Sequence, residues 1–367
     1  MVIAGLTGEP YRALGDPPTR ASSLWETLAR QGQDVRIVHP ELTWRQDALA
    51  KALHFHPRRA AWRHRYLLSR ESVRHLTDDV ERRLAAVGNV DVVLQYQCLF
   101  APGRTRRAPV VIYTDHIYEL TRREYPRWSP LSARGGEAFL VHESATLRRA
   151  DAVLTFSEFT RSAAIEHYGC DPERVHAVGT GANVVVADTA ERRYDQQVAF
   201  FAGYDFERKG GQVLLEAWPE VRRRLPEAQL KIASVDRARR VPDGVEWVGS
   251  LSRTDLNAQY RGASVFVLPS LFEPFGLVFA EAMGSGLPVV ATRSCGVPEI
   301  VLDKETGLLV PTSDAGALAE ALIALLGDPD RARRFGEAGR ERILSHFTWD
   351  RVAARVAAHL ESVVRHD

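Results

Sequence analysis

Cysteine is scarce in this sequence. Its 367 residues include three cysteines, Cys98, Cys170 and Cys295, an odd number without any Cys-x-x-Cys spacing. A disulfide framework needs paired cysteines, and a structural zinc site needs closely spaced ones. The sequence therefore argues against both, and we predict that apolar cores hold the fold together.

The sequence also lacks an excess of positive or negative charge, and it lacks long apolar runs. The formal net charge is +1, which gives no reason to expect a nucleic-acid partner. No apolar run approaches the roughly 20 residues of a membrane-spanning helix. The opening run 1–6 is too short for the apolar part of a signal peptide. We therefore expect a cytoplasmic protein, with peripheral contact at the inner membrane face left open.

That open option depends on one locally basic stretch, residues 51–74. The stretch places arginines among histidines and aromatic residues, with few acids to balance them. Basic amphipathic helices favour anionic surfaces, so an acceptor-binding or membrane-surface helix is one interpretation. The favoured interpretation is a solvated helix face.

Short runs rich in Val and Ile alternate with longer helical patterns along the chain, which is typical of parallel βα units. Apolar residues make up 45% and charged residues 26%, as in a soluble globular enzyme. The predicted strands are 2–6, 35–38, 90–94, 110–113 and 152–156, and then 198–202, 230–233, 245–248, 265–268, 289–291 and 308–310.

The strand pattern restarts after a polar segment at 180–196, which predicts two Rossmann-like domains. We place them at 1–185 and 186–345, followed by a helix at 346–367 that packs back toward the first domain. Parallel sheets bind ligands beyond the carboxyl ends of their strands, so two such domains facing a central cleft would hold the chemistry there. A dehydrogenase is disfavoured, because no Gly-x-Gly-x-x-Gly follows the first strand.

The most informative segment is 268–290, where a buried strand leads through a turn into a helix. The helix begins near Gly276, which lets the main chain approach a ligand closely. Helix starts offer unpaired N–H groups and a positive dipole end. The amides of Phe275, Gly276 and Leu277 are therefore suited to hold a diphosphate.

Two acidic residues accompany this helix start. Glu273 precedes it and can accept hydrogen bonds from sugar hydroxyls, whereas Glu281 lies in the second turn and can reach a ribose. The alternatives are that Glu273 caps the helix and that Glu281 pairs with an arginine at the surface. Glu281 shares its face with Leu277 and Ala280, which should pack inward, and an acid there needs a strong reason.

A second segment, 201–211, delivers Arg208 and Lys209 into a glycine-flanked turn after a strand that ends before Gly203. Cations at this position can neutralise negative charge that grows on a departing diphosphate. An ordinary basic turn is the alternative.

Glu273 and Glu281 match the E-x7-E signature of the retaining glycosyltransferases of the GT4 family, and the segments 286–292, 296–301 and 306–310 resemble that family too. The resemblance implies a GT-B fold, with the acceptor side in 1–185 and the donor side in 186–345. It also implies transfer of a sugar from a nucleotide diphosphate with retention of configuration. No metal or cofactor is implied, only a UDP- or GDP-linked sugar as co-substrate.

The sequence departs from the common family pattern at Tyr204, which stands where an arginine usually follows the glycine. Lys209 keeps its family position, and Arg208 resembles the substitute for the missing arginine. The segment around Val248 and Leu251 resembles the one whose main chain meets the base of the donor.

Three candidates fall in the first domain. Gly15 aligns with the first residue of a Gly-Gly pair common in the family, although Asp16 replaces the second, so plain turn chemistry is the alternative. His116 follows a predicted strand where the family often places a histidine near the transferred sugar; a structural histidine is the alternative. Ser157 resembles a family cleft residue, or caps the helix that it begins.

We therefore predict a retaining hexosyltransferase with Glu273, Lys209, Arg208 and His116 as catalytic residues. Its acceptor would be a glycan, a glycolipid or a small molecule. The alternatives are a nucleotide-sugar epimerase or hydrolase on the same fold and a non-catalytic sugar-nucleotide-binding protein. The Gly-Asp-Pro context of 327–330 indicates a turn between helices rather than an Asp-x-Asp metal motif, so we assign no metal.

Overall fold

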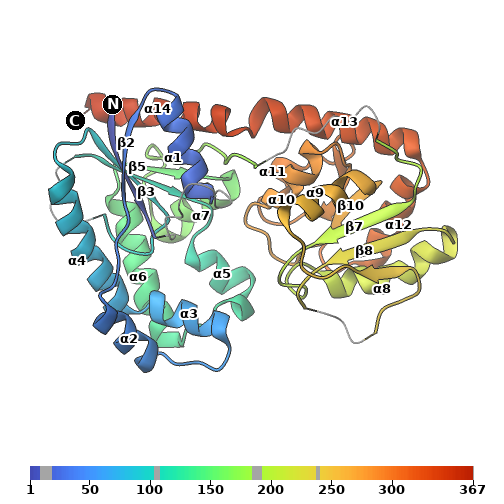
Figure 1. Ribbon diagram of the computed structural model, residues 1–367, viewed down its shortest axis with the longest axis horizontal. Coiled ribbons are helices and arrows are strands. Elements are labelled where there is room, and N and C mark those ends of the chain that lie inside the picture. The colour runs from blue at the N-terminus through green and yellow to red at the C-terminus, as the bar shows by residue number, and fades with distance from the viewer. Residues whose placement is uncertain (9–18, 103–107, 184–191, 237–239, 367) are drawn as a thin grey trace. The chain divides into compact units, whose positions relative to one another are not determined.

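The computed structural model describes residues 1–8, 19–102, 108–183, 192–236 and 240–366. The chain divides into two compact units, Met1–Gly181 with Trp349–Asp367 and Ala182–Thr348. Each unit contains one sheet of six parallel strands (Figure 1). The predicted α/β class with two Rossmann-like parallel sheets is therefore confirmed.

The sheet of the first unit has the order β2-β1-β3-β4-β5-β6, so β1 lies between β2 and β3. The chain first moves from β1 to one side of the sheet and then continues on the other side, which makes β1 and β3 the reversal point. The strands are β1 Val2–Thr7, β2 Asp34–Val38, β3 Val92–Tyr96, β4 Val110–Thr114, β5 Ala152–Thr155 and β6 Val175–Ala177.

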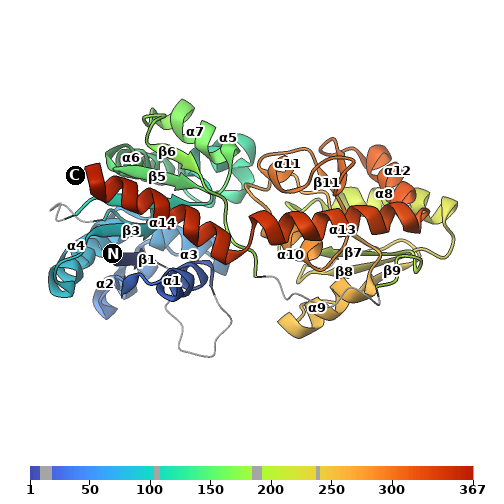
Figure 2. The ribbon, with the colours of Figure 1, turned by 90° about the horizontal axis from the view of Figure 1, so that it is seen from above.

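Helices cover both faces of this sheet. The helix α14 packs beside α1 (Figure 2). On the other face, α4 packs against α6 and α6 against α7. This division between the two faces follows from right-handed crossover connections. The helices of this unit are α1 Arg20–Arg30, α2 Trp44–Leu53, α3 Arg59–Leu67, α4 Arg70–Val87, α5 Tyr118–Glu124, the 3-10 turn η1 Pro126–Trp128, α6 Ala133–Arg149, α7 Glu158–Tyr168 and α14 Trp349–His366.

Two strands of the first unit differ from the prediction. The strand β3 begins two residues later than expected and runs through Gln95, whose polar side chain does not look like a core residue in sequence. Gln95 is nevertheless fully buried, and its amide donates hydrogen bonds to the carbonyls of Gln97 and Phe100, each at 2.7 Å. The three-residue β6 was not predicted, because a run containing one fully buried residue gives no periodic signal.

The second unit repeats the same plan, with the order β12-β11-β10-β7-β8-β9. Here β7 lies between β8 and β10, and every residue of β7, β10 and β11 is buried. The strands are β7 Val198–Ala202, β8 Gln229–Ala233, β9 Val245–Trp247, β10 Val265–Leu268, β11 Val289–Thr292 and β12 Gly307–Val310.

In this unit α8 packs against α12, and α10 packs against α13 (Figure 1). Asp328 caps α13 by accepting a hydrogen bond from the amide of Arg331 at 2.9 Å, so the interpretation of 327–330 as a turn between helices is confirmed. The helices are α8 Gly211–Arg224, α9 Arg253–Gly262, α10 Leu277–Gly284, α11 Val297–Ile300, α12 Ala315–Leu326 and α13 Pro329–His346.

Candidate functional site

The second unit brings two predicted segments together at its reversal point. The loops that follow β7 and β10 start on neighbouring strands; the first carries Lys209 and the second carries Glu273. Lys209 Nζ forms a salt bridge with Glu273 Oε2, and the two side chains are only 13% and 10% exposed. Open α/β sheets bind their ligands at such reversal points. The acid and the cation that the sequence placed 64 residues apart are therefore in direct contact.

Glu273 does not cap the helix that follows it. The N-cap residue of α10 is Gly276, and no side chain makes a cap hydrogen bond there within the described part of the chain. Apart from its pair with Lys209, the Glu273 carboxylate accepts a hydrogen bond from Ser270 Oγ at 3.4 Å. The capping interpretation is therefore wrong.

Glycine is required at the start of α10. Gly276 has φ +94°, in the left-handed region, and a Cβ at this position would lie 2.5 Å from the ring of Phe279 and 3.1 Å from Glu273 Cγ. Phe275 is buried, and Leu277 is half-buried. The main chain from Phe275 to Leu277 thus passes close to Glu273 with no room for a side chain at its centre.

Gly203 plays a similar part at the end of β7. A Cβ on Gly203 would lie 2.9 Å from Lys209 Cγ, so the absence of a side chain lets the lysine stem lie close to the strand end. The Gly203 amide donates a hydrogen bond to the Ala233 carbonyl at 3.0 Å, which ties the start of this loop to β8.

Arg208 links the two loops. Its side chain is 11% exposed, and Nη1 donates a hydrogen bond to the Phe272 carbonyl at 2.9 Å. The Leu271 amide in turn donates to the Arg208 carbonyl at 2.8 Å. Arg208 therefore holds the loop after β7 against the loop after β10, a positioning role that the sequence did not suggest.

Glu281 forms the pair with an arginine that the sequence left open. Arg253 Nη1 lies 2.9 Å from Glu281 Oε1, and the Glu281 side chain is 18% exposed. Val248 and Leu251 precede Arg253, between β9 and α9, and the Val248 amide donates to the Ile232 carbonyl at 2.9 Å.

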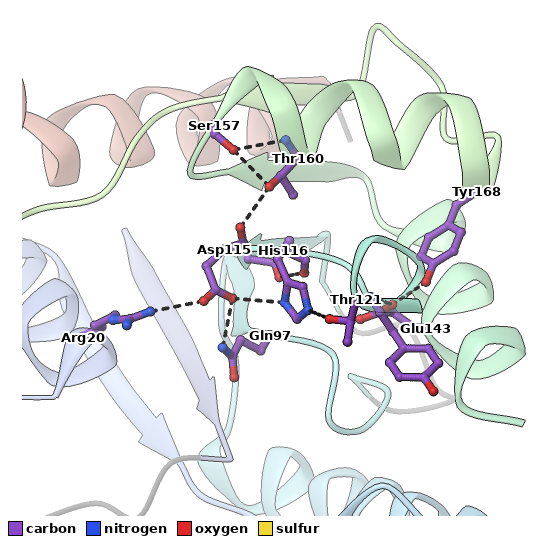
Figure 3. Close-up of polar contacts among 11 residues, drawn as sticks. Arg20, Gln97, Asp115, His116, Thr121, Glu143, Ser157, Thr160 and Tyr168 are labelled. Carbon is purple, nitrogen blue, oxygen red and sulfur yellow. Dashed lines mark hydrogen bonds and ion pairs between the residues drawn. The ribbon is translucent and has the colours of Figure 1, made fainter. Parts of the chain in front are cut away.

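The first unit has a polar cluster at its own reversal point (Figure 3). Asp115 follows β4 and accepts hydrogen bonds from Gln97, after β3, at 3.1 Å and from Arg20, at the start of α1, at 3.2 Å. His116 Nδ1 lies 3.9 Å from Asp115 Oδ1, and its Nε2 lies 2.9 Å from Thr121 Oγ1. The His116 ring is therefore anchored through Nε2, and its Nδ1 faces the Asp115 carboxylate.

The charge on Asp115 is stabilised by this cluster. Burial alone would raise the pKa of the Asp115 carboxyl, but its interactions with His116, and then with Arg20 and Gln97, bring that pKa well below its usual range. Gln97 has φ +60°, an unusual conformation for a residue with a side chain, and such strain is often found at functional sites. Gln97 was not singled out from the sequence, because it belongs to no motif.

The other candidates of the first unit have simpler outcomes. Ser157 caps α7 by accepting a hydrogen bond from the Thr160 amide at 3.1 Å. This is one of the two interpretations that the sequence offered for Ser157. Gly15 and Asp16 lie outside the described residues.

The basic stretch 51–74 does not form one helix, since it spans the end of α2, all of α3 and the start of α4. Part of it is engaged in packing: Trp62 Nε1 donates to the Lys51 carbonyl at 2.8 Å, and Arg65 Nε donates to the Pro130 carbonyl at 2.7 Å.

A cavity of about 1630 Å³ lies along α4 and α6, and Arg70 and Arg74 of this stretch line it. None of the predicted catalytic or donor residues that the structure describes lines this cavity. Among the described residues, no helix is both long and apolar enough to cross a membrane. In that same part of the chain, no group of three or more His, Cys, Asp or Glu residues is placed to hold a metal ion.

Comparison with solved structures defines the class of the fold. Sucrose-phosphate synthase from Thermosynechococcus elongatus superposes with a TM-score of 0.76 at 23% identity, over 100% of both chains. The HepE protein of Anabaena, solved with UDP-glucose, gives a TM-score of 0.65 at 16% identity, over 99% of this chain and 100% of the other. The two-sheet architecture is thus that of the GT-B glycosyltransferases.

Sequence comparison reaches the family. Residues 19–186 match the family described as Glycosyltransferase Family 4, and residues 188–342 match Glycosyl transferases group 1. The MMP alpha-(1->4)-mannosyltransferase of Mycolicibacterium hassiacum is 32% identical over 76% of this chain and 72% of its own length. The chain belongs to glycosyltransferase family 4.

A second relative is the alpha-maltose-1-phosphate synthase of Mycolicibacterium smegmatis. It is 35% identical over 58% of this chain, and the matched part spans 63% of the relative's length. These relatives carry different sugar names, so family membership by itself does not identify the sugar or the acceptor.

Proposed function

We propose that this protein transfers a hexose-type sugar from a UDP- or GDP-linked donor to a hydroxyl group of an acceptor, with retention of the anomeric configuration. The observation that carries the proposal is the buried pair of Lys209 and Glu273 at the reversal point of the second sheet. A cation and an acid held in contact by two neighbouring loops suit a ligand that has both a phosphate and a hydroxyl-bearing ring.

In this proposal Lys209 neutralises the departing diphosphate, beside the main-chain amides at the start of α10. Arg208 keeps the two loops together, with Gly203 leaving the space in which the Lys209 stem lies. Charge develops on the diphosphate as the glycosidic bond breaks, so contacts made to it count most in the transition state. Loss of one such contact typically costs about 2–4 kcal/mol in the barrier.

Glu273 and Glu281 have different roles in the same proposal. Glu273 accepts hydrogen bonds from hydroxyls of the transferred sugar, and its pair with Lys209 fixes its carboxylate close to the diphosphate. Glu281 accepts hydrogen bonds from the ribose, and the main chain around Val248 and Leu251 meets the base. The acceptor hydroxyl attacks the sugar from the face that the diphosphate leaves, and the departing phosphate takes the hydroxyl proton, so neither a protein nucleophile nor a protein base is needed.

The first unit is proposed to bind the acceptor, a glycan, a glycolipid or a small molecule. His116, anchored by Thr121 and facing Asp115, would position the sugar. Residues 51–74 remain our candidate for peripheral contact with the inner membrane face, with Arg70 and Arg74 available along the cavity beside α6. The solved complex of HepE with UDP-glucose supports the choice of a nucleotide-sugar donor.

The proposal is tested by measuring the melting temperature with UDP, GDP, ADP and their common sugars. A ligand that binds only the folded protein raises the melting temperature as its concentration rises. We expect a shift from the UDP or the GDP group, lost in Lys209→Ala and kept in the control Lys231→Ala, whose lysine pairs with Glu246 on the edge strand. No shift with any of the three groups would contradict a nucleotide-sugar donor. Product that forms without any acceptor would instead indicate a hydrolase or an epimerase.

A further inference from the structure

We propose that Arg253 is a specificity-determining residue, which holds the Glu281 carboxylate in position for ribose hydroxyls and so makes the second unit prefer ribonucleoside diphosphates to their deoxy forms. The inference rests on the proposed function, because Glu281 is the ribose ligand there. Arg253 itself acts through Glu281 and is a positioning residue.

The guanidinium of Arg253 joins two segments that are far apart in sequence. Nη1 lies 2.9 Å from Glu281 Oε1 on α10, and Nη2 donates a hydrogen bond to the main-chain carbonyl of Asn183. The Glu281 side chain is 18% exposed and that of Arg253 is 43% exposed. The rigid fork of a guanidinium restrains both partners at once, which the single point charge of a lysine does not do.

The main chain of Arg253 is itself held in place. Arg253 is the first residue of α9, whose N-cap Ser252 accepts a hydrogen bond from the Asp255 amide at 3.2 Å and donates one to Asp255 Oδ2 at 2.6 Å. Leu251, proposed to meet the base, lies two residues before Arg253. One short, capped segment therefore carries both the proposed base contact and the group that fixes the ribose ligand.

A second neighbour of the Glu281 carboxylate, Tyr260, is uncharged. Tyr260 is 1% exposed, and burial, followed by the nearby Glu281 carboxylate, raises the pKa of its hydroxyl well above the usual range. Tyr260 is thus neutral at physiological pH and supplies no charge to hold Glu281. The guanidinium of Arg253, by contrast, is a charged partner in direct contact with Glu281.

Pairing with Arg253 is compatible with ligand binding. A carboxylate offers about four lone-pair sites on its two oxygens. One hydrogen bond from Arg253 Nη1 therefore leaves acceptor capacity for hydroxyl groups. Such hydroxyl bonds to an ionised acceptor are strong only if the carboxylate is already oriented, because an unrestrained side chain loses rotamer freedom on binding.

The experiment measures dissociation constants by titration calorimetry. UDP, GDP and ADP are compared first, and the 2′-deoxy and 3′-deoxy analogues of the tightest binder are then titrated into wild type, Arg253→Gln, Arg253→Lys and the control Arg261→Gln on the same helix. In wild type we expect at least one analogue to bind roughly 10-fold more weakly than the ribonucleotide, as for loss of a hydrogen bond to a charged group. Arg253→Gln should bring that ratio close to 1, Arg253→Lys should give an intermediate ratio, and Arg261→Gln should keep the wild-type ratio.

The outcomes separate this inference from the proposed function. If wild type discriminates between the analogues and both Arg253 variants keep the full ratio, the inference fails while the proposed function stands. If the Arg253 variants lose affinity equally for the ribo and the deoxy forms, Arg253 contacts the phosphates or the base, and this result also overturns the inference. If wild type binds none of the three diphosphates, both the proposed function and this inference fail. Melting curves of each variant identify any that has not folded, and the lysine variant then gives the answer.

Discussion

His176 and His359 stack against each other, with ring centroids 4.4 Å apart and ring planes at 24°. His176 belongs to β6 and His359 to α14, so the contact joins the edge of the first sheet to the last helix of the chain. Burial lowers the pKa of both imidazoles, and next in effect are the charge of Arg161 on His176 and that of His176 on His359. The folded protein therefore favours the neutral form of both rings.

This pair should make stability depend on pH. A histidine whose pKa is lowered by folding binds more protons in the unfolded state, so stability is full above the usual histidine pKa of about 6.5 and falls as the pH drops through it. We expect His359→Asn to flatten the fall in unfolding free energy between pH 7 and pH 5, measured by urea titration. The exposed His346→Gln serves as the control and should leave the slope as in wild type.

Gly203→Ala should reduce activity more than stability. The added methyl group would lie 2.9 Å from Lys209 Cγ, and the flexible lysine stem can move away, at the expense of its pair with Glu273. We expect a stability loss of about 1 kcal/mol or less and a fall in donor turnover of roughly 10-fold or more. Gly262→Ala is the matched control, since nothing lies within 4 Å of a Cβ there. Equal activity of the two variants would argue against a functional role of Lys209.

Gly181→Ala should loosen the return of α14 to the first unit. A Cβ at Gly181 would lie 2.2 Å from the Trp349 ring, which is too close to accommodate without displacing the indole. Overpacking of this kind typically costs about 1–3 kcal/mol. We expect that loss in urea unfolding, whereas Gly316→Ala, whose Cβ would make only an ordinary contact at 3.5 Å, should unfold like wild type.

A buried tyrosine supports a buried acidic residue of α6 in the first unit. Tyr168 Oη donates a hydrogen bond of 2.5 Å to Glu143 Oε2, which also accepts from the Tyr118 amide at 2.7 Å. Tyr168→Phe should cost about 1–3 kcal/mol, because the buried Glu143 carboxyl loses a hydrogen-bond partner. Tyr118→Phe removes a neutral bond to Ser129 and should cost less. A larger effect of Tyr118→Phe would show that Glu143 is not the key partner.

Asp115→Asn tests the assignment of His116. The substitution keeps an acceptor for Gln97 but removes the charge that holds Arg20 and faces the imidazole. We expect turnover to fall roughly 10-fold, as for a general positioning contact, with nucleotide affinity in the second unit unchanged. His116→Ala should give at least the same loss, and normal turnover in both variants would leave His116 as a structural residue.

The architecture was readable from the sequence where burial and periodicity agree. The runs that became β7, β10 and β11 are buried along their whole length, and uninterrupted apolar residues signal such strands clearly. The position of β3 was missed because Gln95 is buried. Its side-chain amide is satisfied by two main-chain carbonyls, and no local sequence pattern predicts those hydrogen bonds.

The candidate site residues divide along the same line. Lys209 and Glu273 were singled out because each belongs to a short segment with recognisable chemistry. Arg253 was not found, since its partner Glu281 is 28 residues away and the spacing has no regular meaning. Asp115 likewise pairs with Arg20, 95 residues distant, which only the folded sheet brings near.

The return of α14 to the first unit has a consequence for synthesis of the chain. Residues 1–181 leave the ribosome well before Trp349 is synthesised. The first unit therefore emerges without the helix that packs against α1 and β5. Its nascent form exposes an apolar face until the entire second unit has been translated. A chaperone that binds during elongation would therefore find its apolar surface on the first unit, not on the part of the chain then leaving the ribosome.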